Sequence, residues 1–159
     1  MRPTNLLRRL AALLVRPHGP VKSFAREVEG AGITGRADAG MATIPTRKVV
    51  GSVGRADALR SDFFYRTGRA VTARFLRIGR AMEQGKVLPP IEVYKARLQR
   101  HPGGAGAPVT EYYVVDGHHR VAMAKKLGQA YLDAHVVEYR VAGGVPAAPE
   151  RDGGPGAGA

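Results

Sequence analysis

The clearest periodic pattern lies in residues 69–84, where apolar side chains recur at intervals of three and four. They are Val71, Phe75, Ile78 and Met82. This spacing places all four on one face of a helix, and Gly85 supplies a stop signal directly after it. The pattern predicts an amphipathic helix over residues 69–84.

Three later segments have the character of strands. Residues 91–96 alternate apolar and polar after the helix-breaking Pro89-Pro90, and residues 109–115 are rich in valine and tyrosine. The Gly- and Pro-rich residues 100–108 between them predict a long turn, so we expect an antiparallel hairpin. A shorter β-branched run at 48–53 also predicts a strand.

A second helix and a final strand complete the pattern. Val121, Ala124 and Leu127 share one face of a helix that begins at His118 and closes at Gly128. Residues 132–139 then predict a strand that buries alternate side chains, including Ala134 and Val136.

The two ends of the chain lack such patterns. Residues 5–15 form a short amphipathic segment, and the rest up to residue 48 is rich in Gly, Ala and charge, with one weakly helical patch at 24–28. We expect residues 1–48 to be a basic extension that is mostly linker, 49–140 to be one α/β (α+β) domain with a small mixed sheet and flanking helices, and 141–159 to be a disordered tail.

Composition narrows the classes of protein. A chain of 159 residues with 44% hydrophobic residues can close one core. The sequence has no cysteine, which excludes disulfides, thiolate metal sites and cysteine nucleophiles. It has no apolar run long enough for a transmembrane helix and no clear signal peptide, so we expect a cytoplasmic protein.

The formal charge of +12 favours a polyanionic partner such as nucleic acid or nucleotide phosphates. Residues 60–80 contain six arginines and only one acidic residue, Asp62, and this excess predicts a basic surface. They are Arg60, Arg66, Arg69, Arg74, Arg77 and Arg80. A solvated face without a ligand is the alternative.

The strongest chemical signal is the turn Asp116-Gly117-His118-His119-Arg120, where a strand runs into a helix. The first helical amides and the helix dipole favour an anion there. Gly117 allows close approach, and His119 and Arg120 can donate to phosphate oxygens. Asp116 either caps the helix or holds Mg²⁺. Lys86, just after the first helix, is a further candidate phosphate contact.

These elements together resemble the ParB/sulfiredoxin superfamily, also called the ParB-like nuclease domain, over residues 49–140. The likeness rests on the Pro-Pro-Ile-Glu-Val segment 89–93, the segment 114–128 from Val-Val-Asp-Gly to Leu-Gly, and Asp-Ala-His-Val at 133–136. The family's turn is Gly-Glu-Arg-Arg in ParB proteins, which bind CTP, and Gly-Cys-His-Arg in sulfiredoxins, which use ATP. Related free-serine kinases carry Asp-Gly-His-Thr-Arg.

The resemblance implies a bound nucleotide triphosphate, ATP or CTP with Mg²⁺, with Gly117 and Arg120 at the shared phosphate positions. His118 stands where ParB has glutamate and sulfiredoxin has cysteine, so it would face the γ-phosphate or substrate and act with Asp116 in catalysis. The absence of cysteine excludes sulfiredoxin chemistry, and the absence of the glutamate departs from the ParB pattern. Nucleotide hydrolysis and small-molecule phosphorylation both remain open.

Three other functions compete with nucleotide chemistry. A metal-dependent nuclease is not expected, because adjacent His118 and His119 diverge by about 100° on a helix and His135 lies in a strand. A DNA-binding, partitioning-related or regulatory protein could hold nucleic acid on the basic surface of residues 60–80 without catalysis. An interaction module could keep the turn only as structure.

Overall fold

The computed structural model describes residues 20–66, 73–101, 103 and 106–142. The amphipathic segment expected at 5–15 and the tail beyond residue 142 lie outside the described residues. So does the start of the first predicted helix, at residues 69–72.

Six strands form one mixed sheet in the order β1-β3-β5-β4-β6-β2. The strands are β1 (Lys22–Ser23), β2 (Ile33–Pro45), β3 (Val49–Ser52), β4 (Ile91–Leu98), β5 (Val109–Asp116) and β6 (Tyr131–Val141). β1, β3 and β5 are mutually parallel, β4 is antiparallel to β5 and parallel to β6, and β2 is antiparallel to β6. The mixed α/β class predicted from the sequence is confirmed.

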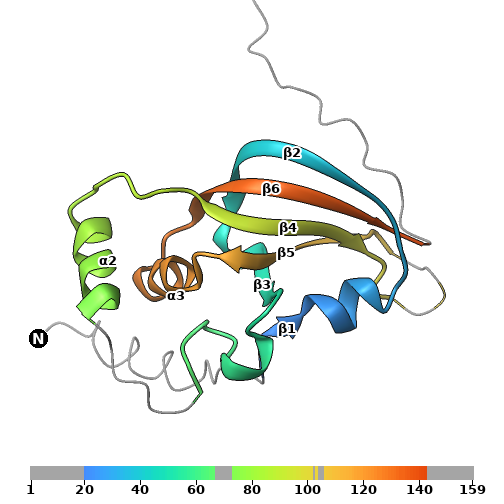
Figure 1. The fold of residues 1–159 in the computed structure, drawn as a ribbon, viewed down its shortest axis with the longest axis horizontal. Helices are drawn as coiled ribbons and strands as arrows, with labels where there is room; N and C mark the ends of the chain where they lie inside the picture. Colours follow the sequence, from blue (N-terminus) through green and yellow to red (C-terminus); the bar gives the residue numbers. More distant parts are fainter. Residues whose placement is uncertain (1–19, 67–72, 102, 104–105, 143–159) are drawn as a thin grey trace, which may run out of the picture.

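Two helices, α2 (Ala73–Glu83) and α3 (His118–Leu127), lie next to each other at one side of the sheet (Figure 1). α2 is followed by Gly85, whose positive φ of 67° and hydrogen bond to the Met82 carbonyl close the chain after the last turn, as its sequence predicts. α3 ends at Gly128 in the same left-handed conformation. Short 3-10 turns, η2 (Thr46–Lys48) and η3 (Ala56–Ala58), flank β3.

The segment expected to be linker is ordered from residue 20, so that part of the sequence prediction is wrong. It holds β1, the helical turn η1 (Ala25–Glu29) and β2, the longest strand of the sheet. β2 gave no sequence signal because nine of its thirteen positions are exposed, so no apolar alternation marks it. Backbone pairing with β6 over residues 131–141 holds it in place instead.

The sheet has an apolar cluster on each face. On one face, α3 buries Val121 and Ala124 against Val93, Val114 and Ala134 of the strands. On the other face, Val28 of η1 and the preceding Phe24 pack into a cluster of buried residues with Ala96, Leu98, Tyr113 and Val141. This second cluster explains why the extension folds onto the domain.

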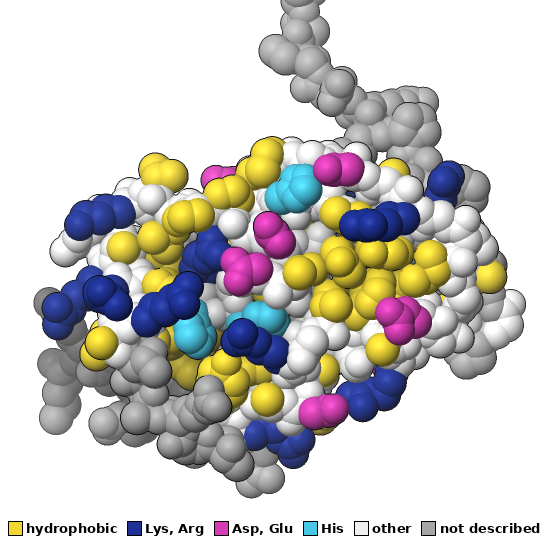
Figure 2. Space-filling model, in the orientation of Figure 1, with side chains coloured by type: hydrophobic (Ala, Val, Ile, Leu, Met, Phe, Trp, Pro, Cys, Tyr) yellow, Lys and Arg dark blue, Asp and Glu magenta, His cyan; other side chains and the backbone are white. Residues whose placement is uncertain are grey.

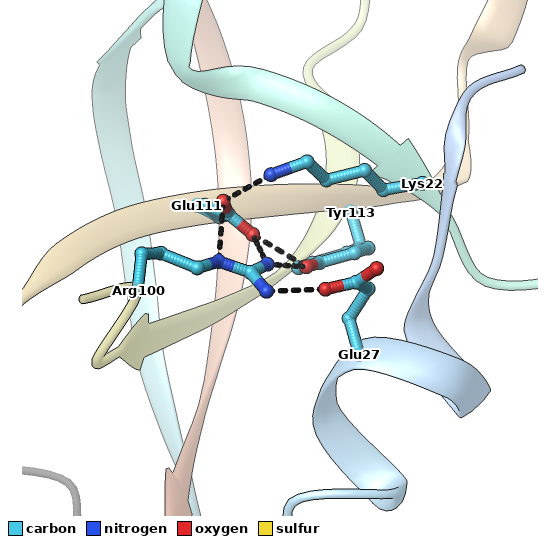
Figure 3. Close-up of polar contacts among 5 residues, drawn as sticks. All are labelled: Lys22, Glu27, Arg100, Glu111 and Tyr113. Atoms are coloured by element: carbon cyan, nitrogen blue, oxygen red, sulfur yellow. Dashed lines mark hydrogen bonds and ion pairs between the residues drawn. The ribbon is translucent and has the colours of Figure 1, made fainter. Parts of the chain in front are cut away.

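An ion cluster around buried Glu111 ties η1 and β1 to the hairpin of β4 and β5 (Figure 3). Glu111 of β5 is only 3% exposed and accepts hydrogen bonds from Lys22 Nζ at 2.6 Å, from Tyr113 Oη at 2.6 Å and from the guanidinium of Arg100. Arg100 also pairs with Glu27 of η1. Burial alone would raise the pKa of Glu111, but these hydrogen bonds hold it below its ordinary value.

No helix within the described residues has the length and apolar character needed to span a bilayer.

Candidate functional site

The predicted turn lies where two parallel strands end. β3 and β5 pair in parallel, with Ser52 opposite Val114, so the residues after both strands meet at one edge of the sheet. Loops at the carboxyl ends of neighbouring parallel strands commonly form ligand sites in α/β proteins. β3 therefore brings residues 52–66 next to the start of α3.

Gly117 occupies the N-cap of α3 with a φ of 102°, a conformation that favours glycine. A Cβ here would lie 2.5 Å from Ile91 Cγ2. The helix has no side-chain cap hydrogen bond, so the proposal that Asp116 caps it is wrong. Asp116 turns back instead, and its carboxylate accepts a hydrogen bond from Arg120 at 3.1 Å. The amides of the first turn thus lack a side-chain acceptor from the cap.

His118 does not face an incoming substrate, and the orientation expected from the sequence is wrong. Its side chain is 5% exposed, and Nε2 lies 2.8 Å from Ser52 Oγ in a buried hydrogen bond. The Arg55 amide donates to the same Oγ at 2.9 Å. Burial, with the charge of Arg55, lowers the pKa of His118 to about 4, so the ring is neutral at pH 7. His118 joins the helix to the loop after β3.

His119 lies on the exposed side of this contact, between Tyr65 and Phe75. The ring centroids are 6.1 Å and 5.9 Å away, respectively. Burial lowers the pKa of His119, and the positive charges of Arg74 and Arg55 lower it further. Arg55 is itself oriented by donating to Tyr65 Oη at 2.9 Å. Figure 2 shows histidine side chains beside Lys and Arg side chains over α3.

The guanidinium of Arg120, predicted to donate to phosphate oxygens, is already held by hydrogen bonds within the protein. Its Nη1 donates to the carbonyls of Pro89 and Pro90, at 2.9 Å for Pro90, and its Nη2 pairs with Asp116. The side chain is 15% exposed, whereas that of Asp116 is 71% exposed. Arg120 therefore holds the segment before β4 against α3, and its partner carboxylate faces solvent.

Two of the four predicted phosphate contacts, Lys86 and Arg120, line the same hollow. His119 points toward Tyr65 and Phe75 instead, because neighbouring helical positions diverge by about 100°. The structure therefore brings the predicted residues to two sides of α3 rather than to a single point.

A metal site is not formed by these side chains alone. Among the described residues, no three His, Asp or Glu groups lie close enough to hold a metal ion together. Asp116 offers one carboxylate, and Mg²⁺ bound through one carboxylate needs phosphate oxygens and water to complete its shell.

The sequence prediction missed Ser52, Arg55 and Tyr65. Ser52 is the last residue of β3, and Arg55 and Tyr65 follow it; the sequence predicts this strand to end at Gly54. Nothing in the residue pattern fixes a parallel pairing of that strand with β5, and this pairing alone brings the three residues to the site.

The fold, a mixed sheet whose strand runs through glycine into a helix, is similar to that of solved proteins in both branches named from the sequence. Sulfiredoxin from Arabidopsis thaliana matches with a TM-score of 0.40 and 16% identity, over 63% of this chain and 86% of the sulfiredoxin chain. A Pnob8-like ParB-N domain matches with a TM-score of 0.38 and 13% identity, over 69% of this chain and 32% of the other. Both TM-scores lie below 0.5, so neither likeness bears on ligand or reaction. No family model and no curated protein matches the sequence.

Proposed function

We propose that this protein binds the phosphate groups of a nucleotide at the N-terminus of α3. The observation that carries the proposal is an uncapped helix start placed beside Arg55 and Arg74. Helix amides and flanking guanidinium groups are the usual donors to phosphate in proteins.

The backbone supports this proposal first. Gly117 leaves the first-turn amides of α3 without a side-chain cap. The positive end of the α3 dipole adds to the attraction of an anion. A ligand oxygen would take the place that a capping side chain occupies in other helices.

The charges support it second. Burial lowers the pKa of His119 most, and the positive charges of Arg74 and Arg55 add to that effect, so all three side chains share one electrostatic environment. Within the described residues, neither arginine belongs to an ion pair. A phosphate bound there would relieve this repulsion and would raise the pKa of His119.

The proposal also includes a reaction on the bound nucleotide. Asp116, exposed at the strand end, is the residue that would bind Mg²⁺ brought in by the phosphates. Buried His118 would act on the reaction by holding the Arg55 loop through Ser52 rather than by touching the substrate.

Calorimetric titration with ATP, CTP and inorganic tripolyphosphate, each with and without Mg²⁺, tests the proposal. Tripolyphosphate isolates the phosphates from the base. Arg74→Ala should weaken binding by about 1.5–3 kcal/mol, the range for a charge-assisted contact. Arg77→Ala is the matched control, since it removes the same charge from the next turn of α2 and should change affinity less than about threefold.

An NMR titration of the His119 ring gives an independent result. Its pKa should rise when tripolyphosphate is added. Equal losses in Arg74→Ala and Arg77→Ala would indicate diffuse attraction rather than a site. The absence of any binding at low salt would refute the proposal.

Nucleic acid is the second candidate ligand. Arg74, Arg77 and Arg80 recur every third residue on exposed positions of α2, which extends the positive charge away from α3. Duplex or single-stranded nucleic acid bound there would show a steep salt dependence, and each arginine-to-alanine change would reduce that slope by about one.

A further inference from the structure

β2 lies at one edge of the sheet, where β6 is its neighbour (Figure 1). Every second residue of such a strand points its backbone amide and carbonyl groups away from the neighbouring strand, so the outer edge can pair with a further strand. Natural edges are usually protected from this pairing by charges, prolines or shortness. β2 is thirteen residues long, its one proline is its last residue, and Arg36 and Asp38 are its only charged residues. β1, at the opposite edge, has only two residues, so β2 is the edge of this sheet that is open to pairing with another chain.

Four side chains of β2 lie on one face of the sheet. Their partners in β6 are every second residue from His135 to Val141, and alternate residues of a strand share a face. The β2 residues opposite them are Ile33, Arg36, Asp38 and Met41. Ile33 is 41% exposed and Met41 is 60% exposed, so two large apolar side chains flank the charged pair on the open surface.

This arrangement is symmetric about Ala37. The register of β2 with β6 shifts twice, within 33–35 and within 38–40, with one shift on each side of Ala37. Such irregularities normally protect an edge, because they turn it away from a straight partner strand. A second copy of β2, antiparallel to the first and centred on Ala37, has its own shifts at the matching places. The same pairing puts Arg36 of each copy opposite Asp38 of the other, and opposite charges that face each other across a strand pair stabilise it.

The two charged groups retain atoms for this contact. The Oδ1 atom of Asp38 accepts a hydrogen bond from the Gly40 amide at 2.8 Å and lies 2.9 Å from His135 Nε2. Its Oδ2 atom has no hydrogen bond within the described part of the chain, and the Asp38 side chain is 66% exposed. Arg36 is exposed and belongs to no ion pair in that same part, and its guanidinium lies 5.8 Å from the centre of the Tyr139 ring.

We propose that this protein forms a two-fold symmetric dimer in which the β2 strands of two copies pair antiparallel about Ala37. The two sheets join into one continuous sheet, and Ile33 of each copy packs against Met41 of the other. A symmetric contact of this kind is closed, because the edge of each copy is used up by its partner. The dimer is independent of the proposed phosphate site on α3, since β4 and β6 separate β2 from the strand that leads into α3.

A cross-link tests the register directly, because the unchanged chain has no cysteine. Directly opposed residues of an antiparallel strand pair have Cα atoms about 4.5–5.5 Å apart, which lies within the range of a disulfide. Mild oxidation of Ala37→Cys should therefore give a covalent dimer. Ala42→Cys, at an exposed position of the same strand, is the matched control. In the dimer its two introduced thiols would lie about 30 Å apart and should cross-link at least about tenfold more slowly.

Sedimentation velocity over a range of protein concentrations measures the dimer itself. A contact through one strand of each copy is small, so we expect a dissociation constant in the micromolar range. Arg36→Asp puts two carboxylates face to face at each of the two charged contacts and should raise that constant at least about tenfold. Arg47→Asp makes the same change of charge on the exposed turn after β2 and should alter the constant less than about threefold.

The reverse substitution gives a second, independent result. Asp38→Arg alone should also weaken the dimer, whereas an equal mixture of Arg36→Asp and Asp38→Arg should form a heterodimer in which every facing pair is again opposite in charge. A mixture of the two folded variants that stays monomeric would overturn the proposal. So would a dimer that Arg36→Asp leaves unchanged, equal rates of cross-linking at the two cysteine positions, or an unchanged protein that is monomeric at millimolar concentration. Circular dichroism shows whether each variant is folded, and if Asp38→Arg is not, Arg36→Asp and the cross-link still decide.

Discussion

Replacing Glu111 with glutamine should destabilise the fold by about 2–3 kcal/mol. Glu111 is 3% exposed, and its carboxylate accepts hydrogen bonds from Lys22, Arg100 and Tyr113. A glutamine keeps one acceptor oxygen but turns an NH₂ group toward donors, so about two charge-assisted hydrogen bonds are lost. Each is worth about 1.5–3 kcal/mol when fully buried. Because the side chains of Lys22 and Arg100 are 41% and 30% exposed, water recovers part of that loss.

Urea unfolding measures this difference in free energy, and Asp57→Asn is the matched control. Asp57 pairs with Arg26 at 2.9 Å, but its side chain is 87% exposed, so its loss should cost less than about 0.5 kcal/mol. Because the folded-state pKa of Glu111 lies below its ordinary value of 4.5, its stabilisation is complete above pH 4.5 and is lost as pH falls through the folded value. The free energies of unfolding of the unchanged protein and of Glu111→Gln should therefore converge in acid. A difference no larger than that of the control, or one unchanged by acid, would refute the reasoning.

Three further predictions concern the backbone and the buried histidine. Gly117→Ala should destabilise the protein by at least about 2 kcal/mol in thermal or urea unfolding, because φ is positive and Ile91 lies 2.5 Å from the new Cβ. Gly51→Ala should also be strongly destabilising, since its Cβ would meet a buried tyrosine ring at 2.1 Å, whereas Gly54→Ala, with no atom within 4 Å, should be neutral or stabilise by about 0.5 kcal/mol. The pKa of His118, measured by NMR, should be about 4. Because this lies below the ordinary value of 6.5, the protein keeps its full stability above pH 6.5 and loses part of it as the pH falls from 6.5 to about 4. A ring that titrates above pH 6 would contradict its burial.

The parts of the fold that the sequence predicted are those whose side chains are buried on one face. β4 alternates Ile91 and Val93 toward the core, and α3 places Val121 and Ala124 there, so both patterns have a period. β2 has no such period, because its stability comes from backbone hydrogen bonds and these leave no mark on residue type. The extension 20–32 was misjudged for a related reason, since the two large apolar residues at η1, Phe24 before it and Val28 within it, are too few to form a repeat.

Only part of the candidate site could be predicted from the sequence, and the reasons are again physical. Gly117 stands out because a strand-to-helix turn needs its conformation, and the structure has it there. The direction of His118 could not be predicted, since it depends on Ser52, which is distant in the sequence. The engagement of Arg120 by Pro89 and Pro90 likewise follows from the packing of the segment before β4 against α3.

The pairing of β2 with β6 has a consequence for how the chain folds. Ile33 lies opposite Val141, so this ladder joins the two ends of the described sequence. Contacts of such large sequence separation close a long loop, and this entropy cost slows the folding of small domains. During synthesis, residues 33–45 have no partner strand until residues 131–141 have left the ribosome, and we expect this edge to be the last part of the sheet to close.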